Sequence, residues 1–305
     1  MEIKKYFPSF TPKVITFSID DGNIKHDKIF IDIVRPAGIK GTFNLYFGSK
    51  RELTDEEYRE FYRGFEIANH CNRHPFAFNK DKEYAFADEL FDPNTADESL
   101  VYKTEREGVY RIRHRNYWAT IATTEAYLEL AEEGRRDIED IFGKGSVKCF
   151  VWPYGKQNDE KLYRALKNSG YSSIRRAYIT GYSIPEDLFE WGVNADSTDF
   201  DSKIREFESL SDDGELKFFC FGLHSVDFER NNKWSELREF AANYGNRPGD
   251  FWYASVSEIF EYSNAINSIE CNEEEIVNPS DKELYVTVDG QKYILAPNSK
   301  TQLKR

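Results

Sequence analysis

Cysteine is scarce in this chain of 305 residues, and so are long apolar runs. The four cysteines are scattered without CxxC spacing: Cys71, Cys149, Cys220 and Cys271. This pattern excludes a disulfide-dense scaffold and fits a reducing compartment. No segment is apolar enough for a membrane-spanning helix, and residues 1–8 show no signal peptide. We therefore expect a cytoplasmic protein, with a secreted form that has lost its leader as the alternative.

Positive charge is also in deficit. Lys and Arg total 41 against 54 Asp and Glu, which gives a net charge of -13 and an isoelectric point near 5.0. Nucleic acids and anionic membranes reward clustered Lys and Arg, so neither is expected as a partner. A neutral or cationic small molecule, or a glycan, fits this charge better. The sequence predicts no particular oligomeric state.

Apolar residues, by contrast, are sufficient for a large core, since 40% of the chain is hydrophobic and 16% aromatic. Their spacing predicts strands that alternate with helices. The predicted strands are 14–19, 42–47, 65–69, 147–152, 172–177, 216–223 and 251–254, and the predicted helices are 25–34, 54–63, 124–142, a segment around 162–166, 234–244 and 256–266. This alternation is typical of a parallel sheet, either a barrel or a doubly wound sheet.

Two regions depart from the alternation. Residues 79–108 are polar and charged, which indicates a surface excursion and not core. After Ser268 the pattern changes to strands, and Asp289-Gly290 between two alternating runs is a strong hairpin signal. We therefore predict a barrel domain over 1–267 and a small β extension over 268–305.

The first chemical signal is the pair Asp20-Asp21, which follows a buried strand and precedes Gly22. Two adjacent carboxylates at the end of such a strand repel each other, so a positive group should lie beside them. A metal ion would meet this need. The alternative is a solvated turn, and this stretch alone favours the turn.

Histidine is rare, with five residues in the chain, yet two of them form His70-Cys71-Asn72-Arg73-His74 directly after a predicted strand. If this segment turns helically, both imidazoles point the same way and can bind one cation together with a carboxylate. The alternative is a chance pair of surface histidines. His224 also closes an apolar strand, and the carboxyl ends of parallel strands meet at one edge of a sheet. Taken together, these residues predict a metal site.

Four segments in order carry a resemblance to a known family. Thr16-Phe17-Ser18-Ile19-Asp20-Asp21-Gly22 resembles the T-F-D-D-G motif of the polysaccharide deacetylases, the NodB-type metal-dependent carbohydrate esterases. His70-x-x-x-His74 is similar to the second motif of that family. Trp152-Pro153-Tyr154-Gly155 is similar to the third, and Gly222-Leu223-His224-Ser225 to the last.

The resemblance implies a distorted (β/α) barrel with about seven parallel strands that removes acetyl groups from an N-acetylated or O-acetylated carbohydrate. It implies a divalent metal, usually zinc, bound by Asp21, His70 and His74. Asp20 would be the general base, His224 the general acid, and the Tyr154 N–H an oxyanion donor. Aromatic rings stack on sugar faces, so we expect Trp152, Tyr154 and Trp191 to contact the substrate. Pro153, between the first two, is expected to contact it as well.

Two departures from the family pattern leave alternatives open. Val151 stands where the family usually has an arginine that pairs with the catalytic aspartate, and Arg176 or Arg175 could supply that charge. The carboxylate that supports His224 is either Asp196 or Asp227. The rival functions are a hydrolase of the same fold that acts on another carbon–nitrogen bond, and a carbohydrate-binding barrel with a disabled site.

Overall fold

The computed structural model describes residues 1–47, 51–79, 82–155, 159–178 and 181–303. The chain forms two compact units, each built from separate stretches of sequence. Unit 1 holds Met1–Phe43, Gly64–Glu66 and Tyr178–Arg305, and unit 2 holds Asn44–Arg63 and Ile67–Ala177. Within the described ranges, no helix has both the length and the apolar character that crossing a membrane requires.

The parallel strands confirm the predicted fold class, a distorted (β/α) barrel. Nine strands are found in the described part of the sheet, and along its path their order is β12-β11-β10-β4-β3-β2-β14-β13, with β15 paired to β2. They are β2 (Lys13–Asp20), β3 (Thr42–Leu45), β4 (Glu66–Asn69), β10 (Cys149–Val151), β11 (Ser173–Tyr178), β12 (Trp191–Val193), β13 (Ala195–Asp196), β14 (Lys217–His224) and β15 (Trp252–Tyr253). The short β12 and β13 carry too few residues for a period-2 pattern, so the sequence did not reveal them.

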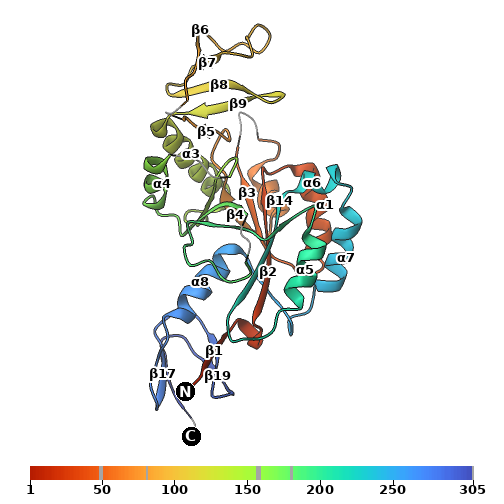
Figure 1. Cartoon of the computed structure of the whole chain (residues 1–305), viewed down its shortest axis with the longest axis vertical. Coiled ribbons are helices and arrows are strands. Elements are labelled where there is room, and N and C mark those ends of the chain that lie inside the picture. Colours follow the sequence, from red (N-terminus) through yellow and green to blue (C-terminus); the bar gives the residue numbers. More distant parts are fainter. Residues whose placement is uncertain (48–50, 80–81, 156–158, 179–180, 304–305) are drawn as a thin grey trace. The chain divides into compact units, whose positions relative to one another are not determined.

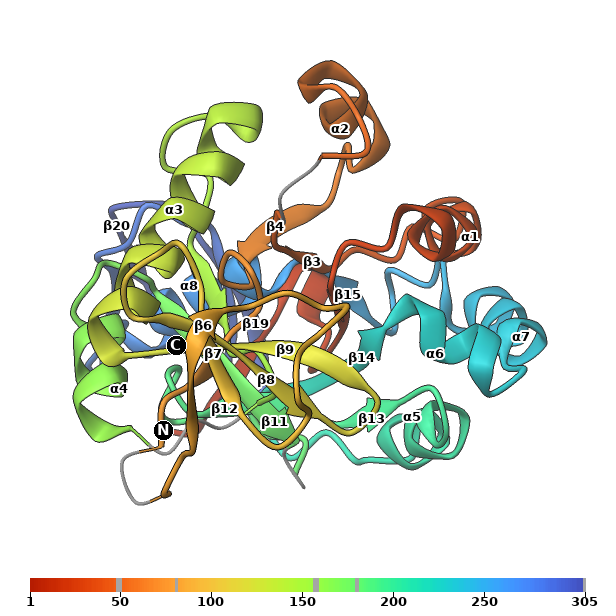
Figure 2. The same ribbon diagram turned by 90° about the horizontal axis from the view of Figure 1, so that it is seen from above.

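Unit 1 is organised on the long parallel pair of β2 and β14, which runs from Lys13↔Lys217 to Asp20↔His224. Four helices line one side of β14 in Figure 2: α1 (Ile24–Val34), α5 (Phe200–Glu208), α6 (Ser225–Arg230) and α7 (Trp234–Tyr244). The ring of Phe17 is fully buried and lies 4.9 Å from that of Phe30 and 6.1 Å from that of Phe221, centroid to centroid. This aromatic core fixes the register that brings Asp20 beside His224.

Unit 2 contains α2 (Asp55–Phe61), α3 (Thr124–Phe142) and α4 (Glu160–Lys167), and in it β10 pairs in parallel with β4 and β11. A capping box begins α2: Thr54 Oγ1 accepts from the Glu57 N–H, and the Glu57 carboxylate accepts from the Thr54 N–H. Helix α3 spans the predicted residues and ends before Gly143. Each predicted helix and strand of the alternation is present.

The polar segment 79–108 is more structured than its composition predicted. It supplies two strands of a five-stranded sheet in unit 2, in the order β5-β9-β8-β7-β6 (Figure 1). The strands are β5 (Phe76–Ala77), β6 (Phe86–Leu90), β7 (Val101–Lys103), β8 (Val109–His114) and β9 (Tyr117–Ala122). Val101 and Tyr102 are buried, so part of the segment is core. We call these five strands the insert sheet.

The carboxyl-terminal strands follow α8 (Val256–Asn267) and make two small antiparallel sheets, β1-β18-β19 and β16-β17-β20. Their bounds are β1 (Ile3–Tyr6), β16 (Glu270–Cys271), β17 (Glu275–Asn278), β18 (Leu284–Val288), β19 (Gln291–Leu295) and β20 (Ser299–Gln302), and a 3-10 turn, η1 (Pro8–Phe10), follows β1. The predicted hairpin is β18–β19, with Asp289 and Gly290 at positive φ in its turn. The division into 1–267 and 268–305 stays a prediction.

Candidate active site

The unit 1 part of the candidate site lies where β2 and β14 end together. Asp20 is buried, with 5% of its surface exposed, and its register partner is His224. Asp21 and Gly22 then turn the chain with φ of 78° and 64°, a left-handed geometry that costs Asp more than Gly. His224 Nε2 lies 3.7 Å from Asp21 Oδ2. The strand register therefore gathers both predicted carboxylates and the predicted general acid.

His224 is held by Asp227, one turn into α6. The imidazole Nδ1 lies 2.8 Å from Asp227 Oδ2, and Arg230 contacts the other carboxylate oxygen at 3.1 Å. Burial alone would lower the pKa of His224, but the hydrogen bond to Asp227 and the nearby charges of Asp20 and Asp21 outweigh it and raise this pKa to about 9. The imidazole is therefore protonated at neutral pH in the metal-free protein.

Asp196, the other candidate for supporting His224, has a different role in the structure. Its carboxylate accepts from the backbone N–H and the hydroxyl of Thr198, at 2.7 and 2.5 Å. Its backbone pairs with Gly222 in the sheet. Of the two carboxylates that the sequence left open, Asp227 is therefore the one that contacts the imidazole, and it reaches the ring because α6 begins directly after His224.

The unit 2 part contains the two histidines, and their geometry fits a divalent metal. The Nε2 atoms of His70 and His74 are 3.1 Å apart. Two nitrogens at ~2.0–2.1 Å from one tetrahedral zinc lie roughly 3.3 Å from each other. His70 Nδ1 lies 2.9 Å from the Val151 carbonyl oxygen, and a carbonyl can only accept, so the Nδ1 carries the proton. The Nε2 lone pair of neutral His70 is then directed at its neighbour, as metal-binding histidines require.

The segment that carries these histidines is not the helical turn that we expected. Cys71, Arg73 and His74 have φ of 58°, 63° and 46°, which makes a left-handed turn of residues that do not favour it. The Asn69 side chain anchors the turn, because its oxygen accepts from the Cys71 N–H at 2.9 Å and its amide donates to Ala131 and Tyr171. The convergence of the imidazoles therefore comes from strained backbone and not from i, i+4 helix geometry.

An aromatic row leads from His74 into the insert sheet. The Tyr154 ring lies 4.4 Å from that of His74 and stacks on Phe76 at 3.5 Å, and His114 lies 4.9 Å from Phe76. Tyr117 follows at 5.5 Å from His114. Tyr154 and Tyr117 are 36% and 41% exposed, so both offer ring surface to a ligand. No local pattern in the sequence marks Phe76, His114 or Tyr117 as site residues, since aromatics at strand ends are more often core.

Two predicted sugar contacts are corrected by burial. Trp152 and Trp191 have 2% and 1% of their surface exposed. Trp152 packs against Tyr127 and Phe150. Neither indole can stack on a sugar from such a position, and of the predicted aromatic contacts only Tyr154 is accessible. Pro153, the fourth predicted contact, is also buried.

The arginine missing from position 151 has a counterpart on the next strand. β10 and β11 run parallel, and Val151 pairs in register with Arg175, which is 1% exposed. Paired residues of neighbouring strands point to the same face of a sheet. Arg176 points to the other face and lies over the Tyr163 ring, 4.5 Å from its centroid. Of our two alternatives, Arg175 therefore lies on the same face of the sheet as Val151, and Arg176 does not.

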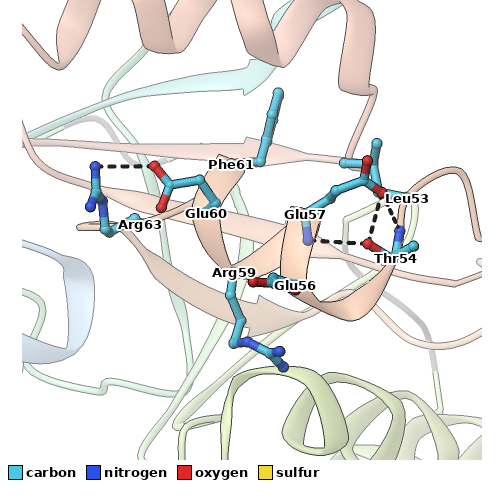
Figure 3. A pocket seen from close by; sticks show the side chains of 8 residues that line it. All are labelled: Leu53, Thr54, Glu56, Glu57, Arg59, Glu60, Phe61 and Arg63. Atoms are coloured by element: carbon cyan, nitrogen blue, oxygen red, sulfur yellow. Dashed lines mark hydrogen bonds and ion pairs between the residues drawn. The ribbon is translucent and has the colours of Figure 1, made fainter.

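A cavity of about 900 Å³ lies around α2 and the residues next to it. Its polar lining is largely paired within itself: Thr54 with Glu57, and Glu60 with Arg63 at 3.1 Å (Figure 3). None of the predicted site residues lines this cavity. We therefore assign it no part in the chemistry.

The chain belongs to the polysaccharide deacetylase family, because the model of that family matches residues 8–174, more than half of the 305 residues. The family consists of metal-dependent hydrolases that act on carbohydrates and on carbon–nitrogen bonds other than peptide bonds. No curated protein sequence matches the chain.

Solved structures with a similar fold include several deacetylases. The Xyl-CE4 domain of a multidomain xylanase from the hindgut metagenome of Trinervitermes trinervoides has 19% identity and a TM-score of 0.45, over 83% of this chain and 92% of that one. The chitin deacetylase of Colletotrichum lindemuthianum has 14% identity and a TM-score of 0.46, over 84% and 88%. A peptidoglycan deacetylase of Bacillus subtilis has 13% identity and a TM-score of 0.43, over 86% and 92%.

Proposed function

We propose that this protein is a metal-dependent deacetylase of N-acetylated carbohydrates. The observation that carries the proposal is the imidazole pair of His70 and His74, with Nε2 atoms 3.1 Å apart and the His70 tautomer fixed by the Val151 carbonyl. Two imidazole nitrogens at this distance are suited to share one cation. Membership of the polysaccharide deacetylase family gives the reaction class.

Asp21, His70 and His74 are the proposed ligands, and zinc is the proposed metal. One carboxylate with two imidazoles is a donor set that can hold a divalent cation and leave positions open for water and substrate. When bound, the cation would polarise the acetyl carbonyl and acidify water. Asp21 is the residue of the pair Asp20-Asp21 that turns out of β2, which leaves Asp20 inside the strand for a different task.

Asp20 is the proposed general base and His224 the proposed general acid. Asp20 would take a proton from the attacking water, and His224 Nε2 would give one to the leaving sugar nitrogen, so that acetate and a free amine are the products. In the metal-free protein the raised pKa of His224 keeps a proton on the imidazole at neutral pH, which suits a proton donor. The Tyr154 N–H would stabilise the negative charge that develops on the acetyl oxygen.

Arg175 is proposed as the positive charge that holds Asp20 in place. A guanidinium with 1% exposure must be paired, because an unpaired buried charge is too costly to keep. Asp20 is a buried carboxylate with the same need for an opposite charge. This pairing replaces the arginine that the family usually has at the position of Val151.

The test combines metal analysis with acetate release from short N-acetylglucosamine oligomers. We expect about one equivalent of metal per chain, and acetate release that requires it. Asp20→Asn should abolish acetate release and keep the metal, whereas Asp21→Asn, the matched change at the next residue, should lose the metal. Protein purified without chelators that holds no metal would overturn the proposal.

Two other outcomes would favour the rival functions. Bound metal with turnover of a different carbon–nitrogen substrate, and no acetate release, would indicate the amidohydrolase alternative. Sugar binding without any turnover would indicate the binding protein. Equal metal loss in Asp20→Asn and Asp21→Asn would show that the division of tasks between the two carboxylates is wrong.

A further inference from the structure

A second cavity, of about 570 Å³, opens between the histidine turn and the insert sheet, all within unit 2. Its lining residues are Arg73, Leu90, Phe91, Thr104, Glu105, Arg106 and Arg111. Cavities of this size suit a small molecule or a single sugar ring. Three arginines line it, although the chain as a whole has a net charge of -13. A positive cavity on an acidic protein is a feature that its composition does not predict.

The three arginines differ in how their charge is balanced. Arg106 forms ion pairs with Glu133 at 2.7 Å and Glu129 at 3.0 Å, so its charge is neutralised. Arg111 donates to neutral groups, the Thr120 hydroxyl at 2.7 Å and the Trp118 carbonyl at 3.0 Å. Among the residues that the structure describes, neither Arg111 nor Arg73 forms an ion pair with a carboxylate. The cavity thus holds two uncompensated positive charges.

These two charges also disfavour each other. Arg111 is half-buried, and this burial lowers the pKa of its guanidinium. The positive charge of Arg73 lowers the same pKa as well. Two like charges facing one cavity cost energy unless an anion enters. Arg73 is moreover held in its exposed position by the left-handed turn between His70 and His74, with φ of 63°. The electrostatic potential in the cavity is therefore positive and favours a negatively charged ligand.

We propose that this cavity binds the carboxylate of an acidic sugar residue next to the one that is deacetylated. The proposal rests on the proposed function in taking a glycan as the ligand. The planar guanidinium of arginine matches a carboxylate with two parallel hydrogen bonds. Leu90 and Phe91 add apolar wall beside the arginines, and Phe91 lies 5.5 Å from the Arg111 guanidinium. An apolar wall beside a cationic one suits a uronic acid, which has an apolar ring face and a charged edge.

Glu105 is the one acidic residue in the lining, and it is exposed. It makes no ion pair with Arg73 or Arg111 in the described part of the chain. A carboxylate at this edge would repel an anionic ligand. Replacing it with the isosteric amide should therefore strengthen the binding that the arginines provide.

The experiment compares two monosaccharide probes on the full chain by NMR titration: methyl β-D-glucuronide, and methyl β-D-glucoside as its neutral counterpart. We expect the glucuronide to bind about tenfold more tightly, because its carboxylate adds hydrogen bonds to charged guanidinium groups and part of their energy is lost to solvent. The preference should weaken as salt is added. Equal affinity for both probes would overturn the inference.

Variants assign the effect to named residues. Arg73→Gln and Arg111→Gln should each remove most of the preference, and Glu105→Gln should increase it. Within the described ranges the Arg73 side chain donates no hydrogen bond, so Arg73→Gln keeps the test valid even if Arg111→Gln perturbs the insert sheet. Arg115→Gln is the matched control, since Arg115 is also exposed and has a positive φ of 54° but does not line the cavity.

The outcomes separate this inference from the proposed function, because binding is read without turnover. If the protein releases acetate but shows no preference for the glucuronide, the acidic-sugar site alone is refuted. An intact preference without acetate release refutes the deacetylase alone. Binding of inorganic phosphate but not of the glucuronide would replace the sugar acid with a phosphate and overturn the assignment of the carboxylate.

Discussion

Asp227→Asn offers the sharpest test of the geometry around His224. The Nδ1 of this histidine lies 2.8 Å from Asp227, and its pKa is raised to about 9. A hydrogen bond to a charged partner is worth about 1.5–3 kcal/mol, and one pKa unit corresponds to 1.36 kcal/mol. Because His224 is partly exposed, we take the lower end and expect its pKa to fall by about one unit, to about 8.

The same change has a consequence for stability with a definite sign. The folded-state pKa of His224 lies above its ordinary value of 6.5, so the stabilisation is complete below pH 6.5 and is lost as the pH rises through about 9. In Asp227→Asn this loss should end about one pH unit lower. Stability would be followed by urea denaturation at several pH values, with unfolding read by fluorescence.

The assay is NMR titration of the histidine ring resonances in metal-free protein, because a bound cation would itself change the pKa of His224. Asp196→Asn is the matched control: it removes a carboxylate in the same unit that contacts Thr198 instead of the imidazole. An unchanged His224 pKa in Asp227→Asn, or an equal fall in both variants, would refute the assignment of Asp227.

Three further predictions concern the rest of the site. Arg175→Lys should reduce kcat/KM for acetate release by roughly tenfold or more because the planar fork is lost, whereas Arg176→Lys should stay within about twofold. Gly134→Ala should lower the free energy of unfolding by about 1–3 kcal/mol, since its Cβ would lie 2.5 Å from Asn69 Oδ1, and Gly249→Ala, in open space, should be neutral by urea denaturation. Removal of metal with EDTA should abolish acetate release, and zinc should restore it; activity that survives complete metal removal would contradict the proposed ligand set.

The part of this fold that alternates between strand and helix could be predicted because each element carries its own periodic pattern. The span of α3 and the capping box of α2 are local features, written in residues that lie within one element. Strands β6 and β7 of the insert sheet were not predicted because residues 79–108 place charges among short apolar stretches. Their pairing is decided by tertiary contacts, such as those that bury Tyr102, and not by local pattern.

The candidate site shows the same division. The sequence predicts Asp20, His70 and His224 as site residues because each follows a strand and the three occur in a recognisable order. The helical turn expected for His70 and His74 was wrong, since a left-handed turn of ordinary residues leaves no periodic signature. Trp152 was also predicted as a sugar contact, but it is buried. The exposure of an indole depends on its tertiary neighbours, which a local sequence pattern does not reveal.

The register of β10 with β11 has a consequence for how such chains can vary. Val151 and Arg175 are partners on the same face, so an arginine at either position would place its guanidinium on that face. Supplying it from both would place two like charges side by side in a buried layer, which is unfavourable. The two positions should therefore exclude each other: Val151→Arg should be tolerated only when Arg175 is replaced by an apolar residue. A motif read along one strand would record the charge as lost, whereas a comparison across the sheet would record it as exchanged.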